Sequence, residues 1–114
     1  KADWLDIQKN GQQSLLCVAG DFNQDLLEIG HYYGSKMERQ LLEDALSEVN
    51  LSCLTAGRSD PVAKQDPSKA TVDHICLGGT RPPIFNVKVD AWSPQQRGKT
   101  LSDHYGVWAQ FSYS

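Results

Sequence analysis

A chain of 114 residues with a formal net charge of −3 is too short for two full domains. Hydrophobic residues make up 39% of it and charged residues 22%, a composition that excludes a disordered or collagen-like chain. No run of Lys or Arg offers the basic surface of a dedicated nucleic-acid binder, although a divalent cation could still bring a phosphate to an acidic site. We therefore expect one globular domain or a part of one.

Cysteine usage and apolar runs bear on the cellular location. Cys17, Cys53 and Cys76 lie in apolar segments, without the CxxC or Cys/His spacing of a zinc site. We expect three buried free thiols and a reducing, cytoplasmic compartment. No apolar stretch is long enough to cross a bilayer, and no signal-peptide pattern is present, so no membrane association is predicted.

The first half of the chain predicts a helical segment at its start, then a strand and a main helix. Trp4 and Ile7 share a helical face with no N-cap before them, so the chain is expected to begin inside an element that extends further upstream. Residues 14–19 predict a buried strand. Residues 35–50 predict the main helix, because the capping-box spacing from Ser35 to Glu38 precedes one apolar face. That face comprises Met37, Leu41, Leu42, Ala45, Leu46 and Val49.

The second half predicts strands joined by turns. Residues 51–55 predict a short strand, and residues 56–70 a polar loop on the surface. Further strands are predicted at 71–77, 84–92 and 105–113. One or two helices with successive strands indicate the α+β class with a mainly antiparallel sheet.

Three short segments place an acid or a histidine beside a strand: Gly20-Asp21-Phe22-Asn23, Val72-Asp73-His74-Ile75 and Ser102-Asp103-His104. A carboxylate at a strand end can polarise water, and an amide two residues later can orient an anionic oxygen. In the third segment Asp103 and His104 are adjacent at the start of a strand, so their side chains point to opposite sides and would have different roles. Asp103 suits a hard metal ion, and His104 suits proton or charge transfer.

Each of these residues also has a structural interpretation. An isolated Asp after a strand is more often a turn residue, since its side chain bonds the backbone two positions on. His74 is interpreted as structural. His31, with Tyr32 and Tyr33, is a weaker candidate for lining a site.

In this order the GDFN and SDH motifs resemble the endonuclease/exonuclease/phosphatase superfamily, which has the fold of pancreatic deoxyribonuclease. The likeness covers nearly the whole chain, so residues 1–114 correspond to the C-terminal half of that domain, with the N-terminal half absent. The resemblance implies half of a four-layer α/β/β/α sandwich.

The resemblance also implies a reaction and a role for each motif residue. The family hydrolyses phosphoesters with Mg²⁺ or Mn²⁺ by in-line attack of water. Asp21 would align or deprotonate that water, and Asn23 would hold the phosphate. His104, steadied by a hydrogen bond that it donates to Asp73, would stabilise charge on the phosphoryl oxygens, while Asp103 would help to bind the metal. The expected substrate is a phosphoester, either a nucleic acid or a small phosphate compound.

The family's N-terminal half carries further metal ligands, an Asn and a Glu, that this chain does not contain. We therefore expect the 114 residues alone to be inactive, and the alternative function is a non-catalytic binding or interaction module. Half of a sandwich would also leave one sheet face exposed. We expect a second copy of the chain, or the absent half, to cover that face, whose expected residues are Leu16, Val18, Ile75, Leu77, Val107 and Ala109.

Overall fold

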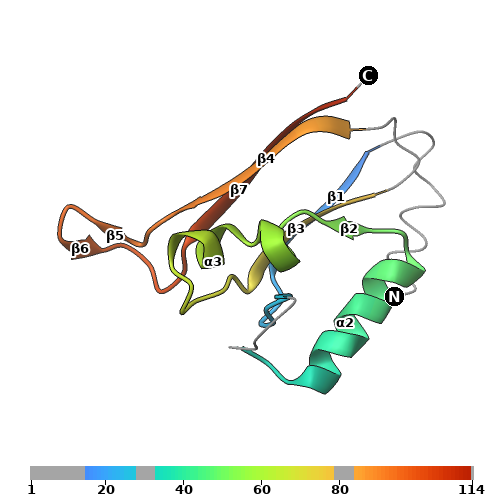
Figure 1. The fold of residues 1–114 in the computed structure, drawn as a ribbon, viewed down its shortest axis with the longest axis horizontal. Helices are drawn as coiled ribbons and strands as arrows, with labels where there is room; N and C mark the ends of the chain where they lie inside the picture. The colour runs from blue at the N-terminus through green and yellow to red at the C-terminus, as the bar shows by residue number, and fades with distance from the viewer. Residues whose placement is uncertain (1–14, 28–32, 79–83, 114) are drawn as a thin grey trace.

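The computed structural model describes residues 15–27, 33–78 and 84–113 (Figure 1). Within these ranges the chain forms antiparallel sheets and two α-helices, α2 (Lys36–Glu48) and α3 (Pro61–Gln65). The predicted α+β class is confirmed. The helix predicted around residues 4–7, together with His31 and Tyr32, lies outside the described residues.

A three-stranded antiparallel sheet forms the centre of the fold. Its strand order is β1 (Leu16–Asp21), β3 (Asp73–Gly78), β2 (Ser52–Cys53). The register places Leu16 opposite Gly78 at one end of the sheet and Asp21 opposite Asp73 at the other. The end of β1 and the start of β3 therefore meet at one edge, as the positions of the first two motifs require.

Helix α2 packs on one face of this sheet. The Ser35 Oγ accepts a hydrogen bond of 3.1 Å from the Glu38 backbone N–H, which confirms the predicted cap. Leu46 and Val49 are buried in the core that α2 shares with the sheet. Met37 and Leu41 were expected on this packed face, but their side chains are exposed because only the C-terminal half of the helix covers the sheet.

A long two-stranded ribbon, β4 (Ile84–Trp92) with β7 (Gly106–Tyr113), lies beside the central sheet and contacts it through β7 and β3 (Figure 1). The strands match the predicted ranges 84–92 and 105–113. A register shift between Phe85 and Lys88 marks a β-bulge. The far end of the ribbon carries a small hairpin, β5 (Gln95–Gln96) and β6 (Lys99–Thr100), within the segment predicted as a turn.

The segment between β2 and β3 is more ordered and more buried than the sequence predicted. It contains a 3₁₀ turn, η1 (Gly57–Ser59), followed by α3. Thr55, Asp60 and Val62 are almost completely buried. The prediction of a surface loop at residues 56–70 is therefore wrong for residues 60–62, because Asp60 caps α3 and turns its apolar residues inward, while residues 58–59 and 67–69 are exposed as predicted.

Of the six residues predicted to form one exposed apolar face, four are divided between two faces of the central sheet, and Val107 and Ala109 lie on β7 in the separate ribbon. Leu16 and Val18 pack against the core beneath α2. Ile75 and Leu77 lie opposite Ala19 and Cys17 and so point to the other face. Leu77 is completely buried there, and the prediction that it faces water is wrong.

The cysteines also differ in their environments. Cys76 is buried and Cys53 is half-buried, but Cys17 is exposed, so the prediction of three buried thiols is wrong for Cys17. The cause is the alternation of β1, in which Leu16 and Val18 take the inward positions and Cys17 takes the outward one. Among the helices that the structure describes, none has the length and apolarity needed to cross a membrane.

Candidate active site

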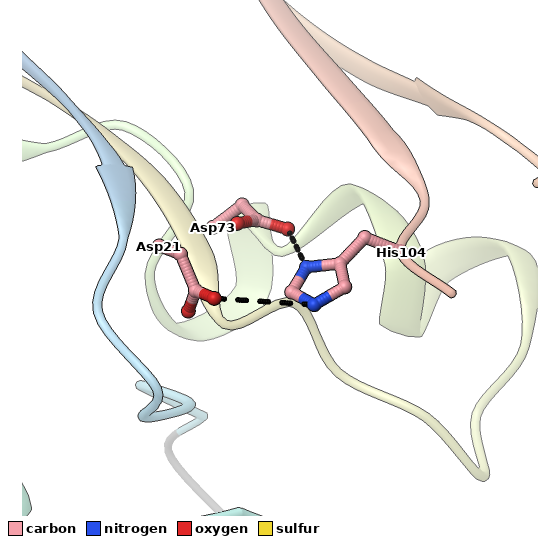
Figure 2. Close-up of side chains that lie close together, drawn as sticks. All are labelled: Asp21, Asp73 and His104. Carbon is pink, nitrogen blue, oxygen red and sulfur yellow. Dashed lines mark hydrogen bonds and ion pairs between the residues drawn. The ribbon is translucent and has the colours of Figure 1, made fainter. Parts of the chain in front are cut away.

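Three segments that are distant in sequence bring Asp21, Asp73 and His104 together (Figure 2). Asp21 ends β1 and Asp73 begins β3, and the antiparallel register sets them directly opposite each other. His104 lies two residues before β7, whose contact with β3 carries the imidazole to the same edge. One potential ligand atom from each of the three side chains lies within 4.8 Å of the other two.

The strongest contact in the site joins His104 to Asp73. The His104 Nδ1 lies 2.6 Å from the Asp73 Oδ2, and the predicted hydrogen bond is therefore confirmed. Since a carboxylate only accepts, Nδ1 carries the proton and donates it. This bond, with the negative charge of Asp73, raises the pKa of His104 above its ordinary value and favours the imidazolium.

Local hydrogen bonds hold both partners of this pair. The Thr71 Oγ1 accepts from the Asp73 backbone N–H at 3.0 Å and donates to the Asp73 carbonyl at 2.8 Å. The His104 backbone N–H donates to the Ser102 Oγ at 3.1 Å. Hydroxyl groups two residues before each member of the pair thus fix its backbone, while the bond to Asp73 orients the ring.

The opposite ring nitrogen faces two further carboxylates. The His104 Nε2 lies 3.9 Å from the Asp21 Oδ2 and 3.9 Å from the Asp103 Oδ1. These distances are too long for hydrogen bonds, and the two charges act on His104 only through space. The Asp103 side chain is 95% exposed, whereas that of His104 is 35% exposed. The acidic groups therefore surround an open edge of the imidazole.

The turn after β1 fixes the Asp21 carboxylate. Its Oδ1 accepts a hydrogen bond of 2.8 Å from the Asn23 backbone N–H, while its Oδ2 faces His104. Asn23 has a positive φ of 53°, a conformation that Asn tolerates better than most residues. The Phe22 backbone N–H donates to the Val72 carbonyl at 2.8 Å and so continues the β1–β3 pairing past Asp21. Asn23 itself is exposed next to the three-residue cluster.

A cavity of about 170 Å³ opens beside the Asp73–His104 pair. Lys69 and Tyr105 line it, and the Lys69 Nζ lies 5.5 Å from the centre of the Tyr105 ring. The remaining lining residues are Tyr33, Val62, Ala70, Thr71, Val72, Pro94 and Asp103. The motifs gave no indication of Lys69, since its proximity to His104 arises only from the tertiary fold.

A buried network lies beneath the site. The His74 Nε2 donates to the Gln24 carbonyl at 2.7 Å, and its Nδ1 lies 2.7 Å from the Thr55 Oγ1. His74 is completely buried, and its ring lies 5.8 Å from that of Phe22 between centroids. The structural interpretation of His74 is confirmed, because the residue ties the segment after Asp21 to the central sheet.

Asp60 supports the wall of the cavity. Its Oδ1 accepts from the backbone N–H groups of Val62 and Ala63, and its Oδ2 accepts from the Thr71 N–H at 3.0 Å. Burial raises the pKa of the Asp60 carboxyl, against the effect of these three donors. The sequence did contain a signal for this residue, since Asp followed by Pro is a common N-cap and N1 pair at a helix start.

Three of the predicted catalytic residues, Asp21, Asp73 and His104, thus come together, while Asn23 lies in the exposed turn after Asp21. The compact cluster consists of Asp21, Asp73 and His104, and Asp103, the predicted ligand, lies at its exposed edge. Two of the nearby carboxylates, those of Asp21 and Asp103, offer the oxygen atoms that hard divalent cations prefer. The donor set therefore fits a hydrated cation at this edge.

Comparisons with protein-family models, with curated proteins and with solved structures found no match to the chain.

Proposed function

We propose that the protein containing this chain is a divalent-metal-dependent phosphoesterase of the endonuclease/exonuclease/phosphatase type. One observation carries the proposal: the 2.6 Å hydrogen bond that holds the His104 ring on Asp73 and directs the other ring nitrogen toward Asp21. A buttressed imidazolium beside an exposed carboxylate suits a reaction in which water attacks and negative charge develops on oxygen.

Each side chain has a role in this reaction. The protonated His104 donates from Nε2 to a phosphoryl oxygen, and Asp73 keeps the ring charged and oriented. Asp21 accepts a hydrogen bond from the attacking water through its Oδ2, which lies 3.9 Å from the His104 Nε2. Lys69 supplies a second positive charge in the same cavity, and Asn23 binds a phosphate oxygen from the turn.

Mg²⁺ or Mn²⁺, when bound, supplies Lewis-acid stabilisation of the phosphoryl charge. Asp103 would hold the cation, because its exposed carboxylate is accessible to a hydrated ion and lies next to the His104 Nε2. Asp21 offers a second oxygen at the same edge. The phosphoester, whether nucleic acid or small phosphate compound, would be held between this edge and the cavity.

The test is hydrolysis of bis(4-nitrophenyl) phosphate and 4-nitrophenyl phosphate by the full-length protein with Mg²⁺, Mn²⁺ or excess EDTA. We expect activity only with a divalent cation. His104→Ala and Asp21→Ala should each lower the rate by about 10²- to 10³-fold, as the loss of one oriented polar group usually does. Asp44→Ala, which removes a carboxylate from the exposed surface of α2, is the matched control and should leave the rate unchanged.

Activity that survives both chelation and His104→Ala would contradict the mechanism. Metal-dependent binding of inorganic phosphate without any turnover would favour the alternative, a binding module that retains the scaffold. Circular dichroism of each variant separates loss of chemistry from loss of fold.

A further inference from the structure

Two cysteines face each other across the central sheet, away from the acidic cluster. Cys53 on β2 lies directly opposite Cys76 on β3. The next pair, Leu54 and Ile75, is joined by a 2.8 Å bond from the Leu54 N–H to the Ile75 carbonyl, so the cysteines occupy the adjacent non-hydrogen-bonded pair. Such pairs have Cα atoms about 4.5 Å apart. This separation falls within the disulfide range of about 4.4–6.8 Å.

The side chains as well as the backbone positions bring the sulfurs together. Both cysteines point toward α2 and pack in the same apolar cluster. The interaction between the two thiols lowers the pKa of Cys53 and raises that of Cys76. The Thr55 Oγ1, 3.4 Å from the Cys53 Sγ, can also donate to a thiolate there. Disulfide formation therefore requires no rearrangement of the strands.

The two thiols differ in their access to solvent. Cys53 is half-buried and lines a groove of about 450 Å³ between α2 and β2. Cys76 is completely buried. A reagent that enters the groove meets Cys53 first and can reach Cys76 only through it.

We propose that Cys53 and Cys76 form a thiol–disulfide pair, with Cys53 as the attacking and Cys76 as the resolving cysteine toward a small disulfide such as glutathione disulfide. The Cys53 thiolate attacks one glutathione sulfur, forming a mixed disulfide and releasing the first glutathione. The Cys76 sulfur then attacks the Cys53 sulfur and releases the second. The two cysteines are oxidised to one disulfide, glutathione disulfide is reduced to two glutathione molecules, and these take up the two protons.

The bond would close the chain segment from residue 53 to residue 76. This segment contains α3 and the Asp60 cap, and its last part, from Lys69 to Asp73, forms a wall of the cavity beside His104. A disulfide stabilises mainly by restricting the unfolded chain. We expect the oxidised protein to unfold at a higher urea concentration than the reduced protein.

The test is peptide mapping of the native protein after exposure to glutathione disulfide, acid quenching, alkylation and digestion with trypsin without reduction. Cleavage at Arg39, Arg58, Lys69 and Lys88 places Cys53 in the peptide 40–58 and Cys76 in the peptide 70–88, while Cys17 remains in a third peptide. We expect the first two peptides to be linked, with the loss of two hydrogen atoms. Of the three thiols in the sequence, those of Cys53 and Cys76 should no longer react with the alkylating reagent, and Cys17 should take no part in the intramolecular bond.

Cys17→Ser is the matched control and should form the same linked peptides, because Cys17 points to the opposite face of the sheet. In Cys76→Ser the glutathione should remain on Cys53 as a stable mixed disulfide. The proposal would be overturned if wild-type Cys53 and Cys76 remained fully alkylated while Cys17 carried glutathione, or if Cys17 were the main partner of either cysteine. The wild-type map is decisive even where a variant fails to fold.

Discussion

The Thr55 hydroxyl stabilises the base of the site, and Thr55→Val measures its contribution. Valine has nearly the shape of threonine, so the substitution leaves no cavity at this completely buried position. It does remove the partner of the His74 Nδ1 at 2.7 Å and the acceptor of the Ile75 N–H at 3.3 Å. A buried polar group without a partner costs about 1–3 kcal/mol. Because the second bond is long, we expect a total loss of about 2–4 kcal/mol.

The assay is urea unfolding followed by tryptophan fluorescence, with Thr55→Ser as the control. Serine keeps the hydroxyl and loses one methyl group, which costs about 1 kcal/mol. Thr55→Val should therefore lower the free energy of unfolding more than Thr55→Ser does. A valine variant as stable as the wild type, or more stable than the serine variant, would refute the inferred network. It would also show that the bond to Thr55 does not help His74 to anchor the segment after Asp21.

Two further predictions concern the groups that position the site. In an NMR titration the His104 ring should lose its proton at a higher pH than an ordinary histidine, and Asp73→Asn should bring that pH down. The stability contributed by the pair is present below pH about 6.5 and lost as the pH rises through the raised pKa of His104, so the stability difference between wild type and Asp73→Asn should shrink there. An identical titration in both proteins would contradict the pairing. Asp60→Ala should lower the free energy of unfolding by about 2–4 kcal/mol, since it removes a helix cap and leaves the buried Thr71 N–H without a partner. A urea midpoint equal to that of the wild type would show that Asp60 does not support the wall of the cavity.

The sequence predicted the long elements well because their signals are local. The capping box at Ser35 marks the start of α2, and the strand predicted at 84–92 matches β4. Helix α3 escaped prediction because five residues are too few to show a helical period, although Asp60 and the proline after it mark its start. Short elements of this kind are recognised by their capping residues rather than by their periodicity.

Which residues share a face of the central sheet could not be predicted from the sequence alone. Alternation within β1 and β3 was visible, but which residues share a face depends on the register between the strands. The observed register puts Val18 opposite Cys76 and Cys17 opposite Leu77. A grouping of Val18 with Leu77 by hydrophobicity alone therefore combined residues from opposite faces.

In the candidate site, too, the residues that belong to sequence motifs were predicted, whereas those brought near by tertiary packing mostly were not. The contact between Asp73 and His104 was predicted because both residues belong to motifs whose order resembles a known family. Tyr33, a candidate for lining a site from the sequence, does line the cavity, whereas Lys69 carries no motif and reaches the cavity only through the packing of its segment. Sequence motifs thus identified the groups that carry charge at the strand ends but only one residue of the walls around them.

The opposition of Asp21 and Asp73 indicates why His104 is required at this position. Like charges directly opposite each other on neighbouring strands destabilise a sheet, yet the register of β1 and β3 forces these two carboxylates together. The His104 ring lies between them, bonded to Asp73 through Nδ1 and facing Asp21 through Nε2 (Figure 2). When it is protonated, the ring offsets the repulsion between the two carboxylates. An arrangement that is unfavourable in the absence of its third member is consistent with the catalytic role proposed for these residues.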